Sequence, residues 1–378
     1  MGYVAVKGGT KAIEESIKRL KYERVKKGTA IELHKIEAGM RGLIDQVMSE
    51  SSLYDQSLAA LAIKQAEGNP EEAVFLLRAY RSTLPRKHVS RVISSENMKV
   101  ERRISASFKD VPGGQILGAT TDYTHRLLDS ELENESDISI QEWLRAFQEE
   151  GHSTENQNDS ADLNSLPKVL DYLRSEGLLA SCENNDLQPG DVTRKSLEFP
   201  SMRSERLQIL TRGQTGAVTS LAYAVIRGYG ALHPTVGELR VGQLPVHLDH
   251  PLLDEGQEED SYYIGDFTAT EAEMLIPLTV EKEQGKKEIE FEIGYGMCMG
   301  QNETKAIAMG ILDNCLEKPN KEFPSHNEEF VLYHIDSVES TGFISHLKMP
   351  HYVTFQSKLD SIRKSKDKTT EQEVGLHE

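Results

Sequence analysis

The sequence has little cysteine. Only Cys182, Cys298 and Cys315 occur in 378 residues, so their number is odd, and no two of them form a CxxC pair. Disulfide frameworks use paired cysteines, and self-contained zinc or iron–sulfur motifs use closely spaced ones. The sequence therefore indicates neither a disulfide-stabilised domain nor a cysteine-based metal centre.

Long hydrophobic runs are also missing. Residues 1–7 lack the apolar stretch of a signal peptide, and no segment has the roughly 20 apolar residues needed to cross a bilayer. Gly2 suggests N-myristoylation, but Val6 stands where that motif requires Ser or Thr. We therefore expect a cytoplasmic protein that does not act at a membrane.

Positive charge is scarce. Lys and Arg total 43 against 61 Asp and Glu, which gives a formal net charge of −18. Such a field repels phosphate, so it argues against general binding of nucleic acid or of an anionic membrane. A polyanionic ligand would have to bind in a local basic pocket.

The order of the expected elements predicts an α+β fold, with helical N-terminal and middle regions packed on a mixed or antiparallel β-rich C-terminal part. Helices are expected at 31–48, 58–66, 70–81, 166–176, 202–212, 216–227 and 303–315. Strands are expected at 3–7, 100–109, 239–248, 267–274, 276–281, 288–293, 330–335 and 341–345. The expected regions are a helical part with a basic segment (1–129), an acidic surface insertion with one short helix near Trp143 (130–165), a part of helices and then strands (166–362) and a charged tail (363–378).

A basic segment precedes a glycine turn. Arg102, Arg103 and Lys109 come before Gly113–Gly114, and Arg126 follows in the run 122–126 (DYTHR). Guanidinium groups beside exposed backbone N–H groups can grip a polyphosphate. A solvated edge strand with surface salt bridges is the alternative, and it is the more common arrangement.

A second segment, 227–234 (RGYGALHP), follows an expected helix and leads to Glu238. Its glycines permit a close approach of the backbone to a ligand, and Tyr229 can stack on a base. Arg227, His233 and Glu238 add ionisable groups. A helix C-cap followed by a tight turn explains the glycines equally well.

A third segment, 294–300 (GYGMCMG), joins an expected strand to a helix that Asn302 caps. A glycine-rich turn at a helix N-terminus can bind an anion. The spacing is neither GxGxxG nor that of a Walker A loop, so a close-packed turn is favoured.

Two histidines, His346 and His351, flank Pro350, which can let both rings converge. Two imidazoles supply half of a tetrahedral metal site, so the other ligands would come from elsewhere. An interface role is equally compatible with the pair. The rival cluster of His247, His250 and nearby aspartates lies in an acidic loop and favours exposure to solvent.

Several segments in order carry a family likeness. They are residues 3–9 (YVAVKGG), 76–81 (LLRAYR), 101–106 (ERRISA), 109–114 (KDVPGG), 122–129 (DYTHRLLD), 227–230 (RGYG), 233–234 (HP), 294–296 (GYG) and 343–352 (FISHLKMPHY). Together they resemble the PhnI family, the nucleosidase-type subunit of the bacterial carbon–phosphorus lyase core complex, along nearly the whole chain. Residues 130–165, 249–260 and the hairpin near Gly285 match poorly and look like surface insertions.

The resemblance implies a reaction. With partner subunits, such a protein displaces adenine from C1′ of MgATP with an alkylphosphonate, giving α-D-ribose 1-phosphonate 5-triphosphate; alone, it is a purine nucleotide nucleosidase. The implied partners are the radical-SAM subunit and an ABC-type ATPase, with no nucleic acid and no membrane. A competing hypothesis is that the chain is mainly a scaffold that docks these subunits.

The resemblance and the required chemistry suggest roles for particular residues. Breaking an N-glycosidic bond develops oxocarbenium character, so a carboxylate is expected near the sugar, and Glu238 or Asp266 is the candidate. The suggested substrate-binding residues are Arg102, Arg103, Lys109, Arg126, Arg227, Tyr229 and His233. By resemblance, His346 and His351 bind Zn²⁺ at the interface with the radical-SAM subunit, and Mg²⁺ enters with ATP.

Overall fold

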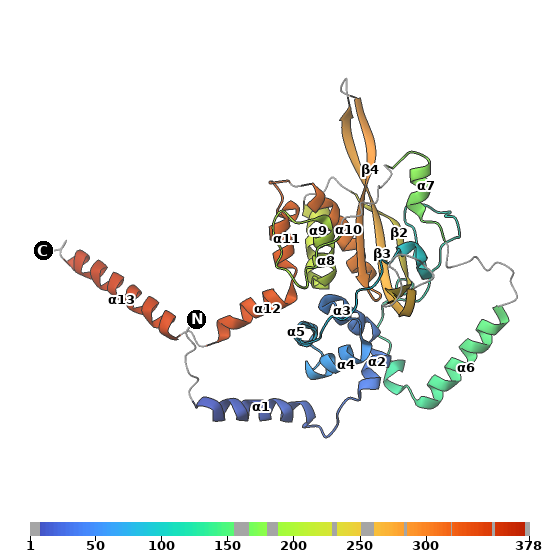
Figure 1. Cartoon of the computed structure of the whole chain (residues 1–378). Coiled ribbons are helices and arrows are strands. Elements are labelled where there is room, and N and C mark those ends of the chain that lie inside the picture. The colour runs from blue at the N-terminus through green and yellow to red at the C-terminus, as the bar shows by residue number, and fades with distance from the viewer. Residues whose placement is uncertain are drawn as a thin grey trace.

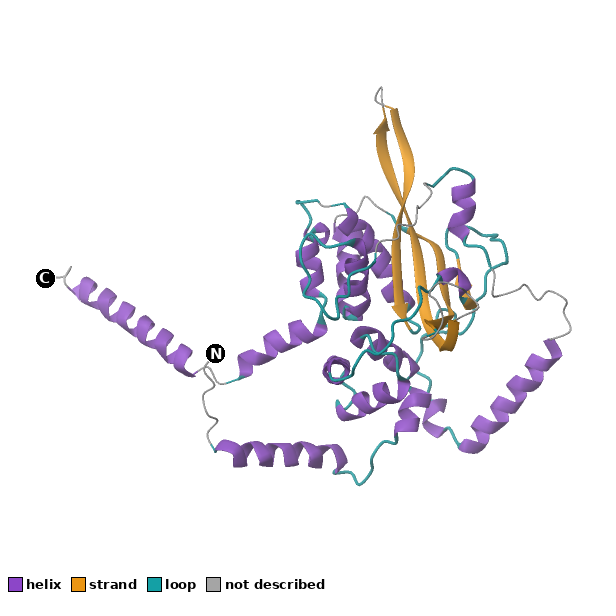
Figure 2. Ribbon diagram, viewed as in Figure 1, coloured by secondary structure: helices purple, strands orange, loops and turns teal. Residues whose placement is uncertain are grey.

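The computed structural model describes residues 8–154, 166–179, 188–228, 233–250, 261–282, 286–318, 320–349 and 352–374. Figure 1 labels the elements where there is room, and Figure 2 separates helices from strands by colour. The longer elements are α1 Gly9–Val25, α2 Leu33–Gly39, α3 Arg41–Ser51, α4 Gln56–Gln65, α5 Pro70–Ser82, β1 Lys99–Ile104, α6 Asp137–Thr154, α7 Val169–Ser175, α8 Arg203–Arg212, α9 Thr215–Gly228, β2 Thr235–Asp249, β3 Ser261–Lys282, β4 Lys286–Met299, α10 Glu303–Glu317, α11 Glu328–His334, α12 Ser337–Ser345 and α13 Tyr352–Val374. The predicted α+β class is confirmed.

The strands form one antiparallel sheet in the order β1-β2-β3-β4. Strand β3 is long because the two expected strands at 267–274 and 276–281 are continuous in it. In the register, Arg103 pairs with Arg240, and Glu238 pairs with Glu273. Side chains alternate between the faces of a strand, so these four charged residues share one face of the sheet.

The opposite face of the sheet packs on α10 through two glycines. A Cβ added at Gly294 would lie 1.9 Å from the carbonyl oxygen of Gly310, and one at Gly296 would lie 2.0 Å from that of Ala306. Residues 294–299 belong to strand β4, so the prediction of a turn across 294–300 was wrong for them. The two glycines instead allow the strand backbone to contact the helix backbone. The helix that follows begins as predicted, with the Asn302 side chain accepting a hydrogen bond from the Lys305 backbone N–H.

A second apolar core lies among α2, α3, α4 and α5, below the sheet in Figure 1. Helix α5 begins as predicted, with Asn69 accepting a hydrogen bond from the Glu72 backbone N–H and Pro70 in the first turn. The single helix expected at 31–48 is instead two helices that meet at Met40.

Two expected strands near the C-terminus are helices. Residues 330–335 lie largely in α11 and residues 341–345 in α12, so this prediction was wrong. The capping signals explain the outcome: Asn327 accepts a hydrogen bond from Phe330 N–H, and Asp336 accepts two from Val338 and Glu339. These caps favour helices more strongly than the short apolar runs favour strands.

Three helices extend away from the body of the molecule (Figure 1): α1, α6 and α13. Helix α1 has no buried residue. Helix α6 has 18 residues and is longer than the short helix expected near Trp143. Trp143 is 63% exposed and stacks on Phe147.

The expected strand 3–7 lies outside the described residues, and the expected region boundaries stay predictions. Within the described ranges, no helix is long and apolar enough to span a membrane.

Candidate functional site

The charged face of the sheet is centred on an ion pair between Arg103 and Glu238. Arg103 Nε donates to Glu238 Oε1 at 2.5 Å, and both side chains are almost completely buried. The other two guanidinium nitrogens of Arg103 donate to the carbonyl oxygens of Pro112 (2.6 Å) and Pro167 (2.7 Å). Arg103 therefore holds the glycine turn and the start of α7 against the sheet.

Glu238 is fully engaged as well. Its second carboxylate oxygen accepts a hydrogen bond from the backbone N–H of Val169 at 3.0 Å, at the first turn of α7. A carboxylate at a helix N-terminus satisfies an otherwise unpaired N–H and interacts favourably with the helix dipole. Both oxygens of Glu238 thus bind protein groups, and its catalytic assignment stays a prediction.

A second ion-pair network lies beside the first. Arg240 Nε donates to Glu271 Oε2 at 3.0 Å, and Lys168 donates to Glu271 Oε1 at 2.9 Å, where the Tyr295 hydroxyl also donates at 2.9 Å. Burial raises the pKa of Glu271, but the charges of Arg240 and Lys168 outweigh burial and lower that pKa to about 2. Burial and the neighbouring Glu271 raise the pKa of Tyr295 well above its usual value.

Glu273 is the least satisfied member of this face. One carboxylate oxygen lies 3.3 Å from Lys168 Nζ, while the other is buried and has no hydrogen-bond partner among the described residues. Burial raises the pKa of Glu273, and repulsion by Glu271 and Glu238 adds to the rise. Glu273 is thus the carboxyl group on this face best suited to hold a proton.

Arg102 points to the opposite face of β1 and is also committed to the protein. Its Nε lies 2.9 Å from Glu303, its Nη2 lies 2.6 Å from Asp122, and its Nη1 donates to the Leu117 carbonyl. These bonds fix the segment after the glycine turn to the N-terminus of α10. Lys109 and Arg126 are exposed, and Arg126 has a left-handed backbone with a φ of 56°.

The two candidate carboxylates do not form one site. Asp266 is exposed and lies seven residues from Glu273 along β3, which corresponds to about 23 Å at the rise of a strand. Its carboxylate accepts a hydrogen bond from Tyr263 and thereby raises the pKa of that phenol. Glu238 pairs with Glu273, whereas Asp266 pairs with Pro245, so the structure separates Glu238 from Asp266.

The remaining predicted residues are less defined. Arg227 is exposed at the end of α9, and His233 is exposed just before β2. His346 Nδ1 is hydrogen-bonded to the Phe343 carbonyl. Tyr229 and His351 lie outside the described residues. The substrate and metal roles of all five residues stay predictions.

The two described histidines of the rival cluster, His247 and His250, form hydrogen bonds with residues at the start of β3. His247 Nδ1 lies 3.2 Å from the Ser261 hydroxyl, and His250 Nε2 lies 2.8 Å from the Tyr262 hydroxyl. No group of three or more potential metal-binding side chains occurs in the part of the chain that the structure describes. These contacts give the histidines a structural role in the β2–β3 pair.

Four arginines outside the predicted site converge between α5 and α8. Arg78 and Arg81 lie on one face of α5, Arg86 follows that helix, and Arg212 ends α8. Their spacing at i and i+3 makes the first two neighbours. The contribution of Arg212 depends on tertiary packing across more than 100 residues, so the sequence pattern gives no signal for it.

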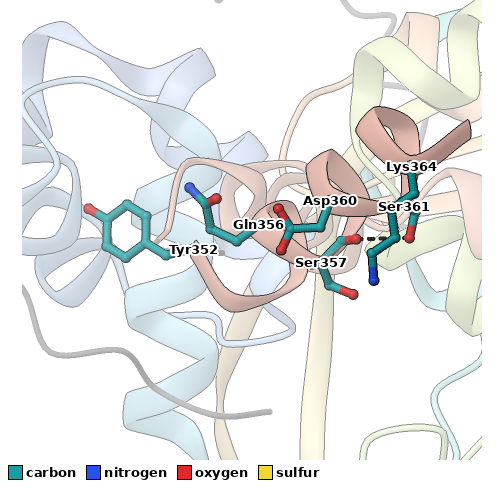
Figure 3. A pocket seen from close by; sticks show the side chains of 6 residues that line it. All are labelled: Tyr352, Gln356, Ser357, Asp360, Ser361 and Lys364. Carbon is teal, nitrogen blue, oxygen red and sulfur yellow. Dashed lines mark hydrogen bonds between the residues drawn. The ribbon is translucent and has the colours of Figure 1, made fainter. Parts of the chain in front are cut away.

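Two concave surfaces lie elsewhere. Figure 3 shows the larger, and all of its lining residues, from Tyr352 to Lys364, belong to α13. Side chains of one exposed helix cannot surround a ligand by themselves, so this surface is no enclosed site. The smaller is an apolar gap between α9, α10 and β3, lined by residues such as Val225, Ile276 and Ile311.

Comparison with known proteins finds similarity along nearly the whole chain. The profile of a family described as the bacterial phosphonate metabolism protein PhnI matches residues 2–369. The chain belongs to the PhnI family. Among curated members, the putative C-P lyase subunit protein HtxH of Stutzerimonas stutzeri is 46% identical over 98% of both chains.

Two further PhnI relatives carry a more explicit name. A protein of Rhizobium meliloti (strain 1021) is 41% identical, covering 96% of this chain and 94% of its own, and one of Escherichia coli (strain K12) is 39% identical, covering 96% and 98%. Both are named α-D-ribose 1-methylphosphonate 5-triphosphate synthase subunit PhnI. The family match over residues 2–369 spans the sheet, the helical core of α2 to α5, helices α1 and α6 and most of α13.

Proposed function

We propose that this PhnI-family chain is a subunit of a phosphonate-degrading carbon–phosphorus lyase system and transfers the ribose 5-triphosphate of MgATP to a phosphonate. The observation that carries the proposal is the full-length identity of 39–41% to two proteins named as subunits of such a synthase. The acidic net charge of −18 is compatible with it, because only a local basic site is needed for an anionic substrate.

The reaction balances as a displacement at C1′. An oxygen of the phosphonate forms a bond to C1′ while the bond from C1′ to the adenine nitrogen breaks. The electron pair leaves with adenine, which then takes up a proton. Positive charge develops on the sugar during this step, so a carboxylate near C1′ and a proton donor near the base would lower the barrier.

Asp266 is the more accessible of the two proposed carboxylates, since both oxygens of Glu238 already bind protein groups. We expect Asp266→Asn to lower kcat strongly and to leave stability nearly unchanged. In this proposal Lys109, Arg126, Arg227 and His233 reach substrate from exposed positions, whereas Arg102 and Arg103 act by shaping the site.

The direct test combines the purified chain with the other lyase subunits, MgATP and methylphosphonate. Adenine is measured by chromatography, and the new ribose–phosphonate ester by ³¹P NMR. Equal amounts of adenine and ester are expected. If adenine appears without ester in the complete mixture, hydrolysis rather than transfer is the activity and the proposal fails.

We also propose that His346, together with His351, contributes to a Zn²⁺ site shared with a partner subunit. A hydrogen bond from Nδ1 to a backbone carbonyl, as at His346, leaves Nε2 as the metal-binding nitrogen. Zinc there would supply a Lewis acid. Metal analysis of the assembled complex with both histidines changed to alanine tests this: stoichiometric zinc in that complex would contradict it.

A scaffold role is the second candidate, and the extending helices favour it. Helices α1, α6 and α13 expose large apolar side chains, including Ile17, Trp143 and Phe355, which partner subunits could cover. Release of adenine from ATP by the purified chain alone distinguishes the two roles. Turnover that Asp266→Asn abolishes supports an intrinsic site, whereas activity only in the complex supports a shared one.

A further inference from the structure

The four arginines Arg78, Arg81, Arg86 and Arg212 form what is called here the arginine cluster. They come from α5, from the segment after it and from the end of α8. Their charges interact: repulsion from Arg78 and Arg81 adds to burial in lowering the pKa of Arg212 to about 10. Burial, with repulsion from Arg78 and Arg86, lowers the pKa of Arg81.

Two members of the cluster are satisfied by the protein. Arg78 donates to the carbonyl oxygens of Glu50 and Arg212, and its Nη1 forms an ion pair with Asp336 at 2.6 Å. Arg86 forms an ion pair with Asp191 and donates to the Thr193 hydroxyl at 3.1 Å. These contacts explain why both side chains are held in place without any ligand.

The other two members are not satisfied. Arg81 donates through Nη1 to the carbonyls of Ser51 and Ser52, and Arg212 donates through Nη1 to that of Val192. Neither has a carboxylate at ion-pair distance among the described residues, and Arg212 Nε is buried without an acceptor there. Two other arginines, Arg174 and Arg206, also have a buried Nε without an acceptor, but each of these forms an ion pair.

Charge balance points the same way. The four guanidinium groups of the cluster face two carboxylates, Asp191 and Asp336, and Asp191 is shared with the exposed Arg194 at 3.9 Å. The buried Glu50 nearby interacts with the buried Lys305. Capping of helix C-termini accounts for the position of Arg78 and for the hydrogen bonds of Arg81 Nη1, because both side chains donate to carbonyl oxygens at helix ends. It does not explain why a chain with a net charge of −18 gathers excess positive charge in one half-buried place.

From this juxtaposition we propose that Arg81 and Arg212, supported by Arg78 and Arg86, bind a tetrahedral phosphorus oxyanion, a phosphate or phosphonate group. A dianion neutralises the two excess charges. Nη1 of each arginine already donates to backbone carbonyls, and Nη2 of each donates to no group among the described residues, so Nη2 is the nitrogen that can donate to the oxygens of the anion. The choice between the nucleotide triphosphate and the phosphonate as the source of the group rests on the proposed function. The cluster binds either by the same chemistry.

The test uses the full chain and ³¹P NMR titration with inorganic phosphate. Arg81→Gln/Arg212→Gln should weaken binding at least tenfold, because both unpaired guanidinium groups are lost. Arg363→Gln, on exposed α13, is the matched control and should bind as the wild type does. Circular dichroism and thermal unfolding establish that each variant is folded.

Competition identifies the source of the group. Displacement of phosphate by ATP but not by methylphosphonate assigns the cluster to the triphosphate, and the reverse result assigns it to the phosphonate. Equal phosphate affinity in the wild type and the folded double variant overturns the proposal, as does absence of binding by the wild type. Adenine release is measured separately, so an inactive wild type that still binds phosphate would defeat the proposed function and leave this site intact.

Discussion

The charged face of the sheet and the arginine cluster both gather arginines inside an acidic protein, but they differ in how those arginines are matched. On the sheet, Arg103 and Arg240 each face a buried glutamate, and their N–H groups also meet carbonyl oxygens. In the cluster, Arg81 and Arg212 have carbonyl contacts but no ion pair among the described residues.

The difference separates structural charge from charge available to a ligand. A buried ion pair with all its hydrogen bonds made holds segments together, and removal of one partner leaves an uncompensated charge. Guanidinium groups that repel each other and have no carboxylate partner cost the folded state free energy unless an anion joins them. Burial alone therefore does not identify a substrate-binding arginine, whereas incomplete pairing does.

The largest effect should follow removal of Arg103. Arg103→Ala leaves Glu238 buried without its partner and releases the glycine turn, so we expect a loss of about 3–5 kcal/mol in the free energy of unfolding. Urea denaturation measures it. Arg363→Ala, which breaks an exposed pair with Asp360, is the control and should change stability by less than about 0.5 kcal/mol. Equal effects of the two changes would contradict the structural role given to Arg103.

The second largest effect should be a loss of folding stability in acid, caused by protonation of Glu271. Its folded pKa of about 2 lies below the ordinary value of 4.5, so it stabilises the fold above pH 4.5 and this contribution is lost as pH falls toward 2. The contribution is about 3 kcal/mol at most. Unfolding curves between pH 6 and 3 should show a smaller pH dependence for Glu271→Gln than for the wild type. Parallel curves would show that Arg240 and Lys168 do not hold this carboxylate ionised.

Much of the fold follows from local signals in the sequence. Asn69, Pro70 and Asn302 mark helix starts that the structure confirms, and the order of helices and strands predicts the α+β class. Local signals also misled: the glycines at 294 and 296 suggest a turn but allow a strand to contact α10. A glycine needed for packing and a glycine needed for a turn look alike until the neighbouring helix is known.

The candidate site was less accessible to sequence reasoning. The basic segment drew attention to Arg102 and Arg103, but their partners Glu303 and Glu238 lie 201 and 135 residues away. No local pattern shows that those arginines are already paired. For the same reason Arg212 escaped notice, because Arg78, which donates to its backbone carbonyl, lies 134 residues away in the sequence.

A smaller effect is expected at Glu273, the exception within the charged face. Its pKa is raised, so ionisation costs stability above that pKa, and the cost disappears as pH falls through it toward 4.5. Glu273→Gln removes the charge and should raise the free energy of unfolding at pH 7 by on the order of 1 kcal/mol. A stability gain that stays constant down to pH 4 would show that repulsion and burial of charge are not its cause.

The smallest effect on stability should come from a substitution of Arg212, although the side chain of Arg212 is large, charged and half-buried. Because its neighbours Arg78 and Arg81 repel it, Arg212→Gln relieves repulsion while it loses one hydrogen bond to the Val192 carbonyl. These effects oppose each other, so we expect a change within about 1 kcal/mol in phosphate-free buffer. Phosphate should then stabilise the wild type against urea more than it stabilises the variant, because only the intact cluster binds the anion. A loss comparable to that of Arg103→Ala would place Arg212 with the structural charges of the sheet and remove the distinction between the two regions.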